Sequence, residues 1–455
     1  MTHSKPRHFS VFLHFGFSLF LILCTVAFLC SATQGVQAEG FNFETEAGKY
    51  SIGQQKVIAP DGEAKDGFGY SSVISDDGST ALIGSYYIEF GIPYPIGPGN
   101  VYAFIKNGNQ WELQQKLPTP EMPESDLFGY VLALSADGNT ALVGAPGGTG
   151  PAETQVPGAA FVFTRNGSTW SQQALLIASD RQVGDHFGFS VALSDDGNTA
   201  SIGSYVDDVG SNANQGSAYV FTRAGSTWSQ QSHLFSSDGA AEDYFGRSVS
   251  LSADGNIALV GANMKVIGSN TRQGAAYTFT RSGTSWSQQT QIILADGAAY
   301  DWFGTVVALS SDGNTALITA NGHKVGQREM QGAGFIFVRS GTSWIQEAML
   351  NAPENSVSLW GDTATLSPDG NLVLIEDGYT FEGNGETWTT GVRLSPEDEA
   401  SGFGSSVALS GDGGIALIGA NYATIGQNSK QGAAYFFDLD LLRLTNHLFL
   451  PLITR

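Results

Sequence analysis

Residues 243–262 read DYFGRSVSLSADGNIALVGA. They contain a Phe-Gly pair, a short run of small and apolar residues, an Asp-Gly pair and a second apolar run that ends in Gly-Ala. The aromatic-Gly pair recurs along the chain, with Trp in place of Phe once: Phe68, Phe128, Phe187, Phe245, Phe303, Trp360 and Phe403. Seven similar units in register indicate an architecture that grows by repetition.

Each unit contains four short stretches with the composition of β-strands. In the quoted unit, Asp254-Gly255 separates the first two, and an Asp-Gly pair lies at the same place in all seven units. Asp-Gly between apolar runs predicts a hairpin, because the tight turn needs positive φ. The third stretch is of the type Ala218–Phe221, and the fourth begins at a Trp such as Trp228. Seven units of four antiparallel strands predict an all-β fold, the seven-bladed β-propeller.

The two ends of the repeated region predict how the ring closes. The last unit has a third strand at Ala433–Phe437, but no Trp-initiated strand follows it. At the other end, Gly48–Gln55 precedes the first Phe-Gly pair and matches the pattern of a fourth strand. We therefore expect this N-terminal strand to complete the last blade, which leaves no large open sheet edge.

These residues resemble the FG-GAP repeat of integrin α-subunit propellers, and more closely the exported bacterial proteins built from the same repeat. The second unit has both halves of the motif, Phe128-Gly129 and Gly144-Ala145-Pro146. The resemblance covers residues 48 to about 438. It implies the propeller fold and says much less about function, because a fold does not by itself determine a function.

Composition and charge exclude several classes of function. The 455-residue chain is 42% hydrophobic, contains 58 Gly and has a formal net charge of −22. No basic cluster lies outside the N-terminal segment, so nucleic acid is not an expected partner. Peripheral docking on anionic lipid is disfavoured for the same reason.

The first 38 residues are interpreted as an export signal. Lys5 and Arg7 precede a mostly apolar run from Val11 to Leu29, and Val36-Gln37-Ala38 offers a cleavage site. An uncleaved membrane anchor is the alternative. The two cysteines, Cys24 and Cys30, both lie in this segment. We expect residues 1–38 to be a signal peptide, 39–438 the propeller and 439–455 a short apolar tail, in a secreted or cell-surface protein without a membrane span after cleavage.

Two sets of acidic residues are candidates for binding a cation. Integrin-type propellers bind calcium in Asp-x-Asp-x-Asp-Gly loops between strands one and two, whereas the loops here are short, as in Ser135–Gly138. Turn formation is therefore the favoured interpretation, and calcium is the alternative. A second set of aspartates, each two residues before a Phe, is a weak candidate for a ring of carboxylates at one channel mouth: Asp66, Asp126, Asp185, Asp243 and Asp301. The competing interpretation is that each Asp caps its own turn.

Binding residues are best sought where the units differ, because the recurring aromatic residues are expected to pack between blades. The loop after the second strand of unit one holds unrepeated aromatic residues, which are candidate binding anchors: Tyr86, Tyr87, Phe90 and Tyr94. A loop that packs on itself is the alternative. No sequence pattern of a catalytic site surrounds His186, His233, His323 or His447.

The sequence thus predicts a non-catalytic binding or adhesion module that presents loops of a rigid propeller to an extracellular protein or polysaccharide. No cofactor is expected, with calcium as the alternative. The competing hypotheses are an extracellular hydrolase or lyase that uses loop carboxylates, and a structural envelope component. The sequence carries no signal for a particular oligomeric state.

Overall fold

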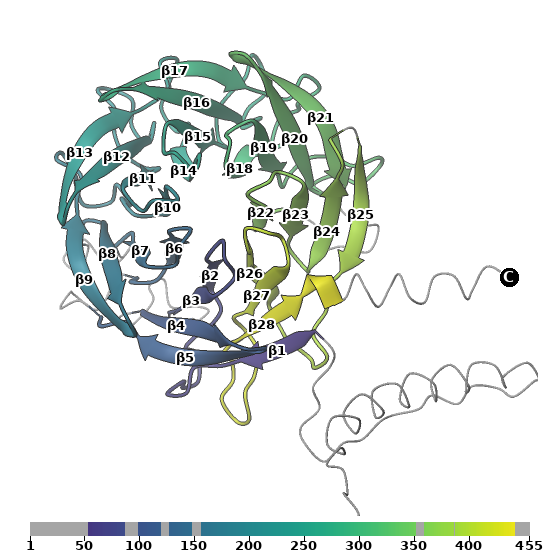
Figure 1. Cartoon of the computed structure of the whole chain (residues 1–455). Helices are drawn as coiled ribbons and strands as arrows, with labels where there is room; N and C mark the ends of the chain where they lie inside the picture. The colour runs from purple at the N-terminus through teal and green to yellow at the C-terminus, as the bar shows by residue number, and fades with distance from the viewer. Residues whose placement is uncertain are drawn as a thin grey trace, which may run out of the picture. The chain divides into compact units, whose positions relative to one another are not determined.

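A computed structural model describes residues 53–86, 99–119, 127–147, 156–351, 359–385 and 387–441. All of these described residues belong to one compact unit. In it, seven four-stranded antiparallel sheets stand in a ring (Figure 1). The structure therefore confirms the predicted all-β, seven-bladed propeller.

The first strand of each blade is innermost and the fourth lies on the rim (Figure 1). The strands of the first three blades are β2 (Ser71–Ile74), β3 (Thr80–Ser85), β4 (Asn100–Asn107), β5 (Gln110–Lys116); β6 (Val131–Leu134), β7 (Thr140–Ala145), β8 (Ala159–Asn166), β9 (Thr169–Leu176); and β10 (Ser190–Leu193), β11 (Thr199–Ser204), β12 (Ser217–Ala224), β13 (Thr227–Leu234). Blades 4 and 5 are β14 (Phe245–Leu251), β15 (Ile257–Ala262), β16 (Ala275–Ser282), β17 (Ser285–Ile292); and β18 (Phe303–Leu309), β19 (Thr315–Ala320), β20 (Ala333–Ser340), β21 (Ser343–Asn351). Blades 6 and 7 are β22 (Ala364–Leu366), β23 (Leu372–Ile375), β24 (Tyr379–Gly383), β25 (Trp388–Arg393); and β26 (Phe403–Leu409), β27 (Ile415–Ala420), β28 (Ala433–Asp438), β1 (Gln54–Val57).

The N-terminal strand closes the ring as predicted. β1 pairs antiparallel with β28, and Gln54 lies opposite Phe437. Gln55 then joins blade 7 to blade 1: its Nε2 donates to the Trp111 backbone oxygen (2.8 Å), and its Oε1 accepts from the Trp111 backbone nitrogen (2.7 Å). Gln115 makes the same pair of hydrogen bonds with Trp170 between blades 1 and 2. The closing joint is therefore built like a joint inside the ring.

The Phe-Gly motif is explained by the close approach of neighbouring blades. Phe245 is fully buried. Gly246 has a φ of 88°, and a Cβ there would lie 2.1 Å from the backbone oxygen of Ser217 in the previous blade. A Cβ on Gly203, at the end of β11, would lie 2.1 Å from the backbone oxygen of Gly246. Both positions therefore require glycine, since no side chain fits between the two backbones.

The apolar core lies between blades. One cluster joins Ala218 and Val220 of blade 3 to Phe245 and Val249 of blade 4. Trp360 takes the place of Phe in blade 6 and is fully buried as well. Complete burial of one such side chain contributes about 1.5–3 kcal/mol. The prediction that the recurring aromatic residues pack between blades is confirmed for the Phe of the motif.

The Asp-Gly turns are also joined from blade to blade. The residue before each turn aspartate bonds to its counterpart in the next blade through the backbone, and six such bonds run around the ring: Asp76 N to Ala136 O, Ala136 N to Asp195 O, Asp195 N to Ala253 O, Ala253 N to Ser311 O, Ser311 N to Pro368 O, and Gly411 N to Asp76 O. Pro368 has no N–H, so it cannot donate to its neighbour in blade 7. This ring of hydrogen bonds fixes the turn face of the propeller.

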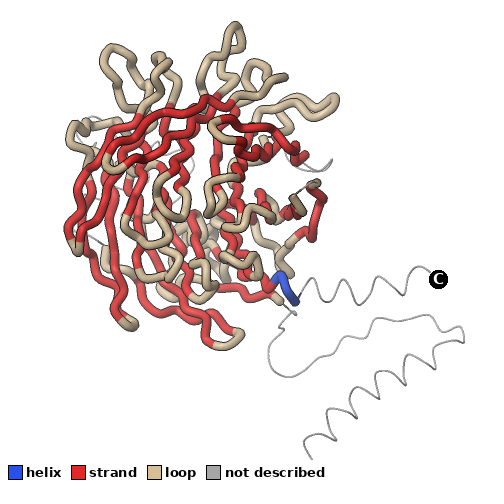
Figure 2. Tube along the Cα trace, turned by 45° about the horizontal axis from the view of Figure 1, so that its top comes forward, coloured by secondary structure: helices blue, strands red, loops and turns tan. Residues whose placement is uncertain are grey.

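Strands (red) run between two loop-covered ends of the propeller, and the longer loops (tan) gather at one of them (Figure 2). Residues 439–441, after β28, are helical, and Leu439 is buried in the core of the last blade. The rest of the predicted tail and the predicted signal peptide lie outside the described residues. No helix in the described part of the chain combines the length and apolarity needed to cross a membrane.

Candidate functional site

Two kinds of loop share the end of the propeller opposite the Asp-Gly turns, which we call the loop face. One kind joins the second strand of a blade to the third, and the other joins a blade to the next. In blade 4 they are hydrogen-bonded to each other: Asn270 Nδ2 donates to the Gly297 oxygen (2.9 Å), and the Phe303 backbone nitrogen donates to the Gln273 oxygen (2.9 Å). The loops therefore support one another, and side chains beside them are held in place.

Of the aromatic residues predicted from the loop of unit one, Tyr86 is in the described part and half-buried. Its ring centroid lies 4.2 Å from that of Tyr70 and 6.0 Å from that of Tyr130. Burial raises the pKa of the Tyr86 hydroxyl to about 12. Tyr87, Phe90 and Tyr94 lie outside the described residues, so their role as binding anchors stays a prediction.

Tyr86 belongs to a continuous set of aromatic side chains, which we call the aromatic arc. Its members, each half-buried, come from blades 1 to 3: Tyr70, Tyr86, Tyr130, Phe189 and Tyr205. The ring centroids of Tyr130 and Phe189 are 5.1 Å apart, and those of Phe189 and Tyr205 are 4.4 Å apart. Such tilted and edge-on contacts are the favoured arrangement of aromatic pairs. The arc is therefore a preformed apolar surface on the loop face.

Sequence reasoning missed most of this arc. Tyr70, Tyr130 and Phe189 follow the Phe-Gly pair directly and were not distinguished from the recurring aromatic residues that pack between blades. The signal was present, because this position is aromatic only in units one to three and is Arg247 in unit four. The glycine before it turns the chain into the innermost strand, so the next side chain lies at the end of that strand.

Arg247 links the arc to the polar side of the loop face. Its guanidinium carbon lies 4.6 Å from the ring centroid of Phe189 and 5.9 Å from that of Tyr205. A cation over an aromatic face is attracted by the ring quadrupole. Burial raises the pKa of Asp362 in blade 6, and the hydrogen bond from Asn321 and the charge of Arg247 offset only part of that rise. The positive charge of Arg247 therefore acts on the Asp362 carboxylate of blade 6.

Hydrogen-bonded side chains of blades 4 to 6 form a second set, which we call the polar arc. Asn263 Nδ2 donates to Thr305 Oγ1 (3.3 Å), and Thr305 Oγ1 lies 3.2 Å from Asn321 Oδ1. Asn321 Nδ2 in turn donates to Asp362 Oδ1 (2.5 Å). The polar arc offers amide, hydroxyl and carboxylate groups within one hydrogen-bonded chain, and Arg247 adds a guanidinium group beside it.

Glu376 extends the polar arc and marks where blade 6 departs from the others. It occupies the place that Gly203 or Gly261 holds elsewhere, after the apolar run of the second strand. Its Oε2 accepts a hydrogen bond from the Gly361 backbone nitrogen (3.0 Å). Burial and the nearby carboxylate of Asp362 raise the pKa of Glu376 to about 7. A proton is therefore exchanged here near neutral pH.

Of the five aspartates predicted as a cation ring, the four that the structure describes each cap a separate turn. Their carboxylates accept from the backbone nitrogen three residues earlier: Asp66 from Glu63 (2.7 Å), Asp185 from Gln182 (2.5 Å), Asp243 from Ala240 (2.8 Å) and Asp301 from Ala298 (2.8 Å). Asp126 lies outside the described residues. Among the residues that are described, no three acidic, His or Cys side chains gather as a metal would require. The structure therefore does not bring this set together as one site.

Two of these aspartates have a buried partner on the neighbouring loop. Lys265 Nζ lies 2.9 Å from Asp243 Oδ2, and His323 Nδ1 lies 3.1 Å from Asp301 Oδ2. In blade 3 the corresponding loop residue is another acid, Asp207. Burial, with Asp207 and other nearby carboxylates, raises the pKa of Asp185 to about 6. The loop residue that faces the capping aspartate thus differs between these blades: it is Lys265, His323 or Asp207. The net charge around the aspartate differs accordingly.

The Asp-Gly turns use their carboxylates internally. In the quoted unit Ser252 Oγ donates to Asp254 Oδ1 (2.7 Å), the Asn256 backbone nitrogen donates to the same oxygen (2.9 Å), and Asn256 Nδ2 donates to Oδ2 (2.8 Å). These bonds lower the pKa of Asp254, against the raising effect of burial. Both carboxylate oxygens of Asp254 therefore already accept hydrogen bonds within the turn, as we expect for a turn-forming residue.

One group resembles a nucleophile with its base. His233 Nε2 lies 2.6 Å from Ser217 Oγ, and His233 Nδ1 lies 3.6 Å from Asp180 Oδ2. Ser217 is fully buried, however, and its hydroxyl also bonds to Asp207 Oδ2. A nucleophile must reach its substrate. This group therefore acts as a hydrogen-bonded support for the loops of blade 3.

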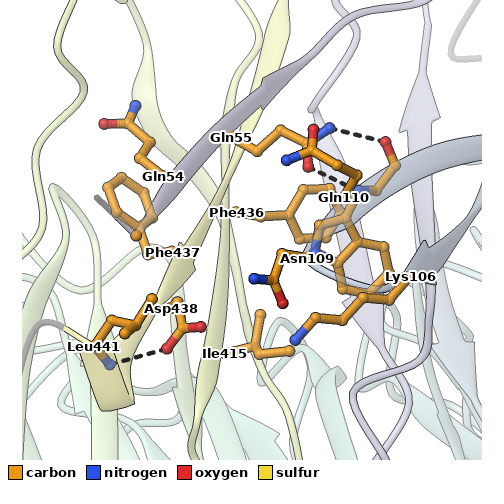
Figure 3. A pocket seen from close by; sticks show the side chains of 12 residues that line it. Gln54, Gln55, Lys106, Asn109, Gln110, Ile415, Phe436, Phe437, Asp438 and Leu441 are labelled. Atoms are coloured by element: carbon orange, nitrogen blue, oxygen red, sulfur yellow. Dashed lines mark hydrogen bonds between the residues drawn. The ribbon is translucent and has the colours of Figure 1, made fainter. Parts of the chain in front are cut away.

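A cavity of about 160 Å³ lies at the closing joint, away from the loop face (Figure 3). Gln55, Lys106 and Phe436 line it, and the ring of Trp111 stacks on Phe436 with centroids 4.0 Å apart. Gln55 contacts the backbone of blade 1 here (Figure 3). Gln55 and Phe436 both contact Trp111 across the joint, so the cavity is a feature of the closure.

Comparison with known families agrees with this architecture. A family model described as FG-GAP repeat matches residues 53–104, 170–221, 228–279, 286–337 and 388–437. Each match runs from the fourth strand of one blade to the third strand of the next. Together the matches span more than half of the chain. The comparison with curated proteins gives no match.

Proposed function

The chain belongs to the FG-GAP repeat family, and from this premise we propose that it is a secreted or cell-surface, non-catalytic binding module. Its rigid ring presents the loop face to an extracellular protein or polysaccharide. The observation that carries the proposal is the aromatic arc, in which Tyr86 joins Tyr70 and Tyr130. Unrepeated, half-exposed aromatic residues are characteristic anchors of binding sites.

Sequence features support the extracellular location. Residues 1–38 have the pattern of an export signal, and both cysteines lie within them. The buried Ser217 supports a role without catalysis, because its hydroxyl is not accessible to a substrate. The occupied carboxylate of Asp254 supports binding that does not depend on calcium.

The test is to probe the purified full chain against arrays of extracellular proteins and polysaccharides, in calcium and in chelator. We expect specific binding that persists in chelator and weakens in the variant Tyr86→Ala. Binding that disappears in chelator would indicate that the binding site lies at the acidic turns instead. Absence of binding to either array would contradict a binding module.

A further inference from the structure

Two positions in each unit border the loop face around the innermost strands: the residue after the aromatic-Gly pair, and the residue that follows the second strand. In blades 1 to 3 these positions are aromatic or apolar: Tyr70, Tyr86, Tyr130, Pro146, Phe189 and Tyr205. In the other blades they are polar: Arg247, Asn263, Thr305, Asn321, Asp362, Glu376, Ser405 and Asn421. Because the ring closes, an apolar half faces a polar half.

The aromatic rings of blades 1 to 3 form one continuous set, the polar side chains of blades 4 to 6 form another, and Arg247 lies where the two sets meet. The aromatic half runs through ring contacts to Tyr205, and Arg247 lies over both Phe189 and Tyr205. The polar half runs through hydrogen bonds from Asn263 to Asp362. A ligand centred on the innermost strands would therefore contact an aromatic surface on one side and hydrogen-bonding groups on the other.

Some hydrogen-bonding capacity in the polar half is unused. Asn263 and Asn421 are 6% and 3% exposed, and the side-chain oxygen of each has no partner. A buried acceptor without a hydrogen-bond partner destabilises the folded state. These two oxygens are themselves closed to solvent, so the groups that a ligand meets at the polar half are exposed ones such as the Asp362 carboxylate.

We propose that the loop face binds a neutral carbohydrate, with a sugar ring seated between the aromatic and polar arcs. The proposal rests on the binding function above and names its ligand class. A pyranose ring offers apolar C–H groups on its faces and hydroxyl groups around its edge, which matches a surface that is aromatic on one side and polar on the other. Asn, Asp and Arg side chains accept from and donate to hydroxyl groups.

Charge favours a neutral sugar over an ionic one. The net charge of −22, with Asp362 and Glu376 at the site, repels acidic polysaccharides. A cationic ligand would compete with Arg247 for the faces of Phe189 and Tyr205. The neutral hydroxyl edge of a sugar avoids both conflicts.

The test measures binding of the full chain to three soluble neutral polysaccharides, a glucan, a mannan and a galactan, with polygalacturonate as the anionic comparison. The variants Tyr130→Ala and Asp362→Ala remove one group from each arc. Tyr300→Ala is the matched control, because this tyrosine is 48% exposed on the blade 4 to blade 5 connection but lies outside the aromatic arc. Thermal unfolding of each variant checks that the fold is kept.

We expect at least one neutral polysaccharide to bind, with affinity about tenfold weaker in each arc variant and unchanged in Tyr300→Ala. Neutral binding that neither arc variant weakens would overturn the proposed site and leave the binding function standing. Binding to polygalacturonate alone, or to an extracellular protein but no polysaccharide, would overturn the ligand class. Failure to bind any protein or polysaccharide would overturn the binding function itself.

Discussion

Replacing Lys265 with Met should strongly destabilise the propeller. Lys265 Nζ lies 2.9 Å from Asp243 Oδ2 and donates to the Asp238 backbone oxygen (2.8 Å). The side chains of Lys265 and Asp243 are only 6% and 2% exposed. Methionine keeps most of the apolar stem but leaves the Asp243 carboxylate without its cation. Breaking a buried ion pair in this way costs about 3–5 kcal/mol.

The assay is urea unfolding at neutral pH followed by tryptophan fluorescence, with far-ultraviolet circular dichroism as a second probe of two-state behaviour. The double variant Lys265→Met/Asp243→Asn should be more stable than Lys265→Met alone, because it also removes the unpaired charge. The amide oxygen of Asn can still accept the hydrogen bond that Asp243 takes from Ala240. The ordering of the single and double variants tests the electrostatic argument directly.

Lys116→Met is the matched control. Lys116 Nζ lies 2.7 Å from Asp61 Oδ2, but the side chains are 38% and 51% exposed. A solvent-exposed pair contributes about 0–1 kcal/mol. If Lys265→Met cost no more than this control, or if the double variant were the less stable of the two, the desolvation reasoning would be refuted.

Three further predictions concern other parts of the ring. The pKa of Glu376 is about 7 in the folded protein against 4.5 for the unperturbed group, so its protonated form stabilises the fold below pH 4.5 and that stability is lost as the pH rises through 7. We therefore expect Glu376→Gln to raise the free energy of unfolding at pH 8 by about 1–3 kcal/mol and to flatten its pH dependence in urea titrations from pH 4.5 to 8. Ser252→Ala removes the donor to Asp254 Oδ1 and the acceptor of a backbone amide, so the urea midpoint should fall by the equivalent of about 2 kcal/mol. Gln55→Ala removes both bonds to the backbone of Trp111, which should lower the unfolding free energy by about 1–2 kcal/mol and speed amide exchange in β1.

The fold was predictable because each unit repeats the same local constraints. The Asp254-Gly255 pair predicts a hairpin from two residues alone. The absence of a Trp strand after Ala433–Phe437, together with the match at Gly48–Gln55, predicts the pairing of β1 with β28. The closure of the ring could be inferred by counting strands. Every blade has four strands only if the N-terminal strand joins the three strands of the last unit.

The aromatic arc was harder to predict, because its residues come from several blades and meet only after the ring has closed. Tyr86 was singled out from its own loop, whereas Tyr130 and Phe189 are in the repeated motif and looked like core residues. Comparing the residue after each Phe-Gly pair across units would have separated them. The hydrogen-bonded chain from Asn263 to Asp362 crosses three blades, and no pattern within one unit indicates it.

The same constraints explain why variation is concentrated at so few positions. At the joint between blades 3 and 4, a side chain on Gly246 or Gly203 would strike the backbone of the neighbouring blade, so neither position accepts one there. Blades 5 and 6 carry Thr319 and Glu376 in the place of Gly203. The residue after the aromatic-Gly pair, such as Arg247, lies at the end of an innermost strand and is only half-buried, so the ring tolerates Tyr, Phe, Arg, Thr, Asp or Ser there. Under the proposed binding function, the positions that build the ring and the positions that contact the ligand are therefore one residue apart. Tyr130 contacts the rings of Tyr70 and Phe189 in the neighbouring blades, whereas Asp362 accepts a hydrogen bond from Asn321, so equivalent positions give the two halves of the loop face different chemistry.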